Sequence, residues 1–212
     1  MRRKYRWPKT KPDVPPKLYP SGEPFGWFNG ENRMVLQTLL GSESQVVLEL
    51  GAFLGLSTIY LMQYAPNATI LTVDHWKGSR EHQGKAYADV IDRLFETFCV
   101  HLWDYRERII PMKTRTLDGM IELHDLGVTP EVVYIDASHE TGPVFADTAV
   151  AMSLWPEAHI VGDDGRWLTI LQALKDLAPN TDREIINYGN CWEIPPKGTP
   201  ATWPDGLKRK KA

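Results

Sequence analysis

The sequence has few cysteines and no long apolar run. Only two cysteines occur among its 212 residues, Cys99 and Cys191, and neither belongs to a Cys-x-x-Cys or Cys/His pattern. This excludes a zinc site of that kind and a disulfide framework. The longest apolar stretches, at 46–50 and 131–135, are far below the roughly 18 residues that a membrane span requires. The basic N-terminus is followed by prolines, which is unlike a secretory signal. We therefore expect a cytoplasmic protein that does not enter a membrane.

Composition and charge indicate a globular body with basic ends. Hydrophobic residues make up 42% of the chain and charged residues 24%, as in soluble domains. The net charge of −3 hides an asymmetry, because bases cluster in residues 1–17 and in KRKK at 208–211. The acidic body between them disfavours nucleic acid as a partner. The ends are typical of solvated termini, with an anionic partner as the alternative. The sequence leaves open whether the chain forms a homo-oligomer.

Prolines divide the N-terminus from the rest of the chain. Six of them lie between residues 8 and 24 and exclude a helix or a central strand there. We expect residues 1–28 to form an extended arm, whose PFGWF segment (24–28) docks on the core or on a substrate cleft. Residues 29–195 then form the main domain, and residues 196–212 a basic C-terminal tail.

Short apolar segments alternate with helical patterns across the main domain. They predict strands at 46–50, 69–73, 108–112, 131–135, 158–162, 183–188 and 190–194. Helical spacing occupies the intervals between the first six, including one long helix over 91–102. Such alternation predicts a Rossmann-like α/β fold: a seven-stranded, mostly parallel sheet with helices on both faces and an antiparallel last strand. Ligands bind such sheets outside the carboxyl ends of the strands.

A glycine-containing loop follows the first predicted strand. The segment ELGAFLGLST (49–58) matches neither the dinucleotide fingerprint Gly-x-Gly-x-x-Gly nor a phosphate-binding P-loop. Gly51 allows a tight turn, Gly55 a close approach to a ligand, and Ser57 a helix cap. The carboxylate of Glu49 suits a cationic amino-acid group better than a pyrophosphate. An ordinary strand-to-helix turn is the alternative.

The second strand ends in Asp74, His75 and Trp76. An acid at this place can accept hydrogen bonds from both hydroxyls of a ribose, and an adjacent aromatic ring can flank an adenine. The alternative is that Asp74 only caps the next segment.

Acidic residues follow the fourth and fifth strands, which should be neighbours. Asp136 ends the fourth strand, Asp163 and Asp164 end the fifth, and His139 lies beside them. Three converging carboxylates repel one another unless a pKa rises or a cation binds, and oxygen ligands suit Mg²⁺, Mn²⁺ or Ca²⁺. His139 is placed to take a proton. The alternative is that these acids cap a helix or pair with bases such as Arg166.

Together these segments resemble the class I S-adenosylmethionine-dependent methyltransferases. ELGAFLGLST, VDHW (73–76), YIDASHE (134–140) and IVGDD (160–164) are most similar to the metal-dependent O-methyltransferases of the catechol O-methyltransferase type and to the tailoring methyltransferases of macrolide and cephalosporin pathways. The resemblance covers about residues 30–195. It implies methyl transfer from S-adenosylmethionine to a hydroxyl of a small molecule or sugar, assisted by Mg²⁺ or another divalent cation.

The resemblance also implies roles for individual residues. Asp136, Asp163 and Asp164 would bind the metal, and His139, with Asp136, would be catalytic; the catechol-type branch has a lysine where His139 stands. Two other functions stay open: a different nucleotide-cofactor enzyme on a similar sheet, and a non-catalytic cofactor-binding module. The residues expected to hold the cofactor are Glu49, Gly51, Ala52, Gly55, Ser57, Asp74, His75, Trp76 and Asp136.

Overall fold

The structure is a computed structural model that describes residues 7–79 and 87–204. The basic residues expected at the two ends fall largely outside these ranges, including the KRKK segment at 208–211. In the described part of the chain, no helix has the length and apolar character needed to cross a bilayer. Cys99 and Cys191 are both buried and unpaired.

Seven strands form one sheet in the order β3-β2-β1-β4-β5-β7-β6. β7 is antiparallel to both of its neighbours, and the other pairings are parallel. This is the predicted fold, and β3 lies at an edge of the sheet. The bounds are β1 Val46–Leu50, β2 Thr69–Asp74, β3 Ile109–Lys113, β4 Val132–Ile135, β5 His159–Gly162, β6 Ile186–Asn187 and β7 Trp192–Ile194.

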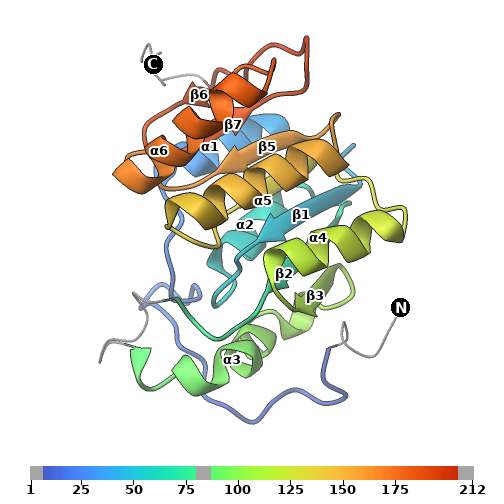
Figure 1. The fold of residues 1–212 in the computed structure, drawn as a ribbon. Coiled ribbons are helices and arrows are strands. Elements are labelled where there is room, and N and C mark those ends of the chain that lie inside the picture. Colours follow the sequence, from blue (N-terminus) through green and yellow to red (C-terminus); the bar gives the residue numbers. More distant parts are fainter. Residues whose placement is uncertain (1–6, 80–86, 205–212) are drawn as a thin grey trace.

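Helices cover both faces of this sheet and enclose one apolar core on each side (Figure 1). One face packs against α1 (Gly30–Leu39), α2 (Leu56–Tyr64) and α3 (Leu94–His101). The other packs against α4 (Thr116–Asp125), α5 (Thr141–Leu154) and α6 (Leu168–Leu177). The long helix predicted over 91–102 is divided: a 3-10 turn, η3 (Ile91–Arg93), precedes α3, and a second, η4 (Trp103–Tyr105), follows it. A third, η5 (Ala178–Asn180), extends α6.

The proline-rich segment from residue 7 to residue 28 runs across α3 and the first loop. Its Trp7 indole stacks on Phe98 and donates a hydrogen bond to the carbonyl of Ile109 at 2.7 Å. Further on, His101 accepts from the Lys17 amide at 3.0 Å, while its Nδ1 lies 2.8 Å from the Leu54 carbonyl. Burial lowers the pKa of His101, which keeps the ring neutral, as these two bonds require. The arm is thereby tied to the loop that follows β1.

Candidate functional site

A cleft crosses the carboxyl ends of the parallel strands, where the sequence predicts ligand binding. Its larger part has a volume of about 630 Å³ and lies between the arm, the loop after β1 and the loops after β4 and β5. A smaller part of about 340 Å³ lies between the ends of β2 and β3 and the start of α5. Gly51 and Asp136 line both parts, so the two meet between β1 and β4.

Glu49 lies beneath the first loop and not in the wall of the cleft. Its side chain is fully buried and accepts hydrogen bonds from the hydroxyls of Ser57, Thr58 and Thr72 at 2.5, 2.7 and 2.6 Å. Burial raises the pKa of Glu49 to about 7, although the three hydroxyl donors act in the opposite direction. Glu49 is not among the residues that line either part of the cleft, so its predicted contact with a ligand stays a prediction. The carboxylate fixes the start of α2.

The two glycines of the loop make room for different neighbours. Gly51 has a φ of 88°, and a Cβ there would lie 2.1 Å from the carbonyl oxygen of Asp136. Gly55 has a φ of 93°, and a Cβ there would lie 2.8 Å from Leu102. Only glycine fits either position without strain. Gly51 lines the cleft as expected, whereas Gly55 packs against the core rather than a ligand. Between them, Ala52 lines the larger part of the cleft.

The residues that end β2 are divided between cleft and core. Asp74 and His75 line the smaller part of the cleft. Asp74 also accepts backbone hydrogen bonds from Ala52, Phe53 and Trp76 at 2.6–3.0 Å, and so ties this end to the first loop. Trp76 differs from the prediction that it flanks a ligand. It is 4% exposed, and its ring packs on Phe95 and Phe98.

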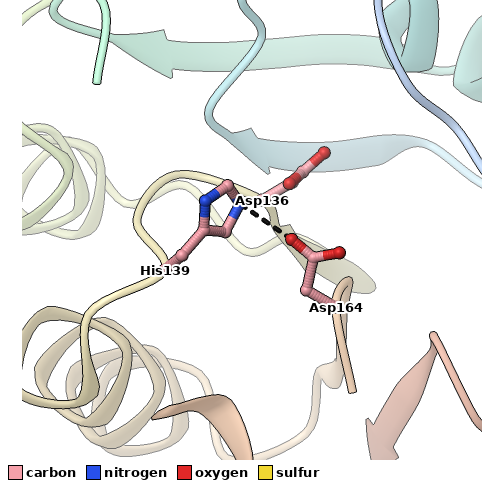
Figure 2. Close-up of side chains that lie close together, drawn as sticks. All are labelled: Asp136, His139 and Asp164. Carbon is pink, nitrogen blue, oxygen red and sulfur yellow. Dashed lines mark ion pairs between the residues drawn. The ribbon is translucent and has the colours of Figure 1, made fainter. Parts of the chain in front are cut away.

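The acids after β4 and β5 converge as the strand order requires. Ile135 pairs with Gly162, so Asp136 and Asp163 leave neighbouring strands at the same level. Figure 2 shows the side chains of Asp136, His139 and Asp164 gathered beyond the ends of their strands, with the His139–Asp164 ion pair dashed. One ligand atom from each of these three lies within 4.8 Å of those of the other two, and His139 Nε2 is 2.8 Å from Asp164 Oδ2. This is a donor set that could hold a cation.

Asp163 is not one of the three residues of this cluster, although it lines the same part of the cleft. Its Oδ1 accepts hydrogen bonds from the Asn29 side chain and the Asp164 amide, both at 2.5 Å. Of the predicted metal ligands, Asp136 and Asp164 are brought together, and the third member of the cluster is the predicted base His139 and not Asp163. Asp163 and Ser57 still line the larger part of the cleft, but Ser57 gives its hydroxyl to Glu49 and caps no helix end.

The electrostatics of the cluster favour a positive charge. Burial, followed by the neighbouring charges of Asp163 and Asp164, raises the pKa of Asp136 well above its usual range. Burial also raises the pKa of Asp163 to about 6. Carboxylates that are costly to ionise together are stabilised by a bound cation or by shared protons.

Backbone strain gathers around the same cleft. In the part of the chain that the structure describes, three non-glycine residues have positive φ: Phe53 at 47°, Trp76 at 46° and Asp164 at 57°. They follow β1, β2 and β5, the strands whose ends border the cleft. Left-handed conformations of such residues cost energy and cluster at functional sites. The position of this strain agrees with the position of the acids.

Sequence reasoning missed several residues of the cleft. Asn29 caps α1 through its Oδ1 and also binds Asp163, and the signal for it was an asparagine just before a helical pattern. Asp147 lines the smaller part from the buried face of α5. Its signal was a single acid at helical spacing among Val144, Thr148 and Ala151. Trp27 was not missed, because it belongs to the 24–28 segment that is expected to dock on the core or on a substrate cleft; it is 54% exposed, lines the larger part and lies near the rings of Phe53 and Tyr87.

Comparison with known families gives one match. A family model described as a methyltransferase domain matches residues 48–165, more than half of the chain. The matched segment runs from β1 to the loop after β5 and so includes both parts of the acidic cluster. Among curated protein sequences, none matches the chain.

Solved structures with similar folds include several methyltransferases. TomG from Streptomyces achromogenes, an O-methyltransferase in complex with SAM, is 16% identical with a TM-score of 0.58, over 80% of this chain and 82% of TomG. An O-methyltransferase from Bacillus cereus in complex with SAH is 16% identical with a TM-score of 0.54, over 82% and 84% of the two chains. The MycE methyltransferase of the mycinamycin pathway, in complex with Mg and SAH, is 17% identical with a TM-score of 0.52, over 84% of this chain and 54% of MycE. At these identities the likeness shows a shared fold.

Proposed function

The chain belongs to the methyltransferase family whose domain it matches, and from this premise we propose that it methylates a hydroxyl group of a small molecule. S-adenosylmethionine is the methyl donor, and a divalent cation such as Mg²⁺ assists. The observation that carries the proposal is the convergence of Asp136, His139 and Asp164 on the same cleft that Gly51 and Asp74 line. The complexes of TomG with SAM and of MycE with Mg and SAH support the donor and the cation.

The cofactor would lie across the meeting point of the two parts of the cleft. Asp74 would accept hydrogen bonds from the ribose hydroxyls on its free lone pairs, beside the exposed ring of His75. Gly51, Ala52 and Ser57 would border the methionine end in the larger part. Glu49 would act through Ser57 and the first turn of α2, which it holds in place.

The donor set at the acidic cluster fits a hard divalent cation. Asp136 and Asp164, which belong both to the predicted ligands and to the observed cluster, would hold it with carboxylate oxygens. When bound, the cation supplies a Lewis acid that lowers the pKa of an acceptor hydroxyl. Asp163, which already holds Asn29 and the Asp164 amide, would fix the loop that presents Asp164.

His139 would take the proton of the acceptor hydroxyl. The acceptor oxygen then bonds to the methyl carbon as the carbon–sulfur bond breaks, which leaves S-adenosylhomocysteine. The chain contributes chiefly orientation to such an in-line displacement. His139 lies against the ring of Trp167 with centroids 4.6 Å apart, which fixes the imidazole at the wall of the cleft. Trp27 and the other arm residues that line this part of the cleft would bind the remainder of the acceptor.

Two measurements test this function. Calorimetric titration with S-adenosylhomocysteine should give a saturable heat of binding, and a panel of hydroxylated acceptors should be methylated in a manner that EDTA abolishes. Absence of binding at millimolar ligand would contradict the donor assignment. Full activity in EDTA would remove the cation from the mechanism.

The substitution His139→Ala tests whether His139 accepts the proton or binds the metal. We expect a loss of about 10²–10⁴-fold in turnover, the usual worth of a positioned general base. Mn²⁺ binding, measured by electron paramagnetic resonance, should be retained. His124→Ala, which removes an exposed histidine of α4, is the control and should keep full activity. Loss of Mn²⁺ binding in His139→Ala would make His139 a ligand instead of the base.

A further inference from the structure

Asp147 is a nearly buried carboxylate that opens onto the smaller part of the cleft. Asp147 is 3% exposed and lies on the buried face of α5. In Figure 1 this helix lies in front of the sheet. Its Oδ1 accepts a hydrogen bond from the Thr116 hydroxyl, at the start of α4, at 2.7 Å. Its Oδ2 accepts none from any residue that the structure describes. Because Asp147 lines the cleft, the little surface that it exposes belongs to the cleft wall.

Such an oxygen favours a ligand that brings a hydrogen-bond donor. A buried acceptor without a partner costs free energy, and for a charged group the cost is higher than for a neutral one. Burial raises the pKa of Asp147 to about 6, which agrees with an environment lacking a compensating charge. The nearest basic side chain in this wall, Arg115, instead forms a two-pronged contact with Asp118 at 2.9 and 3.2 Å.

The order of groups along the cleft indicates which part of a ligand reaches Asp147. Gly51 and Asp136 mark the junction with the larger part, and Asp74, at the ribose position, lies in the smaller part. The smaller part continues to Thr116 and Asp147, at the starts of α4 and α5. A nucleoside whose ribose lies at Asp74 and whose sulfur faces Asp136 would have room for its base in the rest of the smaller part, which these two residues line.

We propose that Asp147, held by Thr116, accepts a hydrogen bond from the exocyclic amino group of the cofactor's adenine and so selects adenine over bases that lack this donor. The inference rests on the proposed use of an adenosyl cofactor. It assigns base selection to a residue of α5 that takes no part in the acidic cluster.

The test compares two ligands on three forms of the protein by calorimetry. The ligands are S-adenosylhomocysteine and its 6-desamino analogue, which has hydrogen in place of the amino group. The wild type should bind the first about 10- to 100-fold more tightly, as expected for one hydrogen bond to a charged acceptor. Asp147→Leu should bind both ligands equally, with the affinity that the wild type has for the analogue. Asp125→Leu removes an exposed acid at the end of α4, outside the cleft wall, and should keep the wild-type ratio.

The outcomes distinguish a failure of the Asp147 assignment from a failure of the proposed function. If the wild type binds S-adenosylhomocysteine but Asp147→Leu keeps the same preference, or the wild type shows none, the assignment of Asp147 is wrong and the proposed function stands. If the wild type binds neither ligand, both fail. Should Asp147→Leu not fold, Asp147→Asn keeps the shape of the side chain, and its preference should fall below about 10-fold because a neutral acceptor forms a weaker bond.

Discussion

Glu49 and the acidic cluster both lie near the carboxyl ends of the strands, but their carboxylates have opposite kinds of neighbours. Glu49 is completely buried, yet three hydroxyls donate to its two oxygens. Asp136 and Asp164 are partly exposed, and their neighbours include other acids and one histidine. The first arrangement satisfies the hydrogen-bonding capacity of both carboxyl oxygens and stabilises a loop. The second leaves charge to be satisfied by something that enters the cleft, which is what a binding site requires.

The largest effect should come from the acidic cluster. Asp136→Asn should lower kcat/KM by about 10³-fold, equivalent to about 4 kcal/mol, because it removes a cation ligand at the acceptor site. In EDTA its thermal stability should equal or exceed that of the wild type, because the change also removes repulsion between carboxylates. Asp118→Asn, on the exposed face of α4, is the control for loss of a charge. A marked loss of stability in Asp136→Asn would mean that this carboxylate is satisfied as Glu49 is.

Glu49 should show its effect in stability and its pH dependence. Its pKa is about 7 in the folded protein against 4.5 for an ordinary glutamate, so the folded state binds more protons between these values. The free energy of unfolding should therefore fall as pH rises from 4.5 to 7, by about 3 kcal/mol relative to Glu49→Gln, which does not titrate. Urea unfolding of the two proteins across this range measures the difference.

A second substitution checks the cause of that effect. Glu49→Leu leaves three buried hydroxyls without their acceptor and should be destabilised at every pH, because a buried polar group without a hydrogen-bond partner costs free energy. If wild type and Glu49→Gln keep a constant difference from pH 4.5 to 7, Glu49 is not held in the state described here.

The family and the sheet could be predicted because their signals are local. Short β-branched runs, most of them followed by an acid or a glycine, fix both the strands and the edge at which the acids meet. The family match confirms the resemblance that those segments carry. The division of roles among the acids depends on contacts between distant residues. Asp163 turns to Asn29, which lies 134 positions away in the chain, and no spacing rule reports such a contact.

Trp76 and Gly55 also show that a sequence pattern does not reveal which distant residues a side chain will contact. An aromatic residue after a strand end is as suitable for a cleft wall as for a core. The positive φ of Trp76 directs its ring onto Phe95 and Phe98 in the core. Gly55 could equally have admitted a ligand, but Leu102 occupies the space. Sequence pattern therefore located the edge of the sheet that holds the site, and packing decided which side chains face the cleft.

The smallest effect is expected at Asn29. Its side chain donates a hydrogen bond to Asp163, which therefore has a partner within the protein, as Glu49 has. Asn29 caps α1 by accepting from the Asn32 amide at 3.0 Å, and its side chain amide donates to Asp163 at 2.5 Å. Asn29→Ala removes both bonds, whereas Asn29→Ser keeps a capping oxygen and removes only the donor to Asp163. Because a helix cap contributes about 1 kcal/mol, Asn29→Ala should be less stable than Asn29→Ser by about that amount.

Urea unfolding at pH 7 with EDTA measures these differences without a contribution from bound metal. Asn67→Ala, which removes an exposed asparagine whose amide bonds only to the Ser42 carbonyl, should stay within about 0.5 kcal/mol of the wild type. If Asn29→Ser is as unstable as Asn29→Ala, the bond to Asp163 dominates and the cap contributes little. Asp163 would then depend on its donor as strongly as Glu49 depends on its three hydroxyls. If instead Asn29→Ser is as stable as the wild type, Asp163 tolerates the loss of its donor. The hydrogen bond from Asn29 then does not distinguish Asp163 from Asp136.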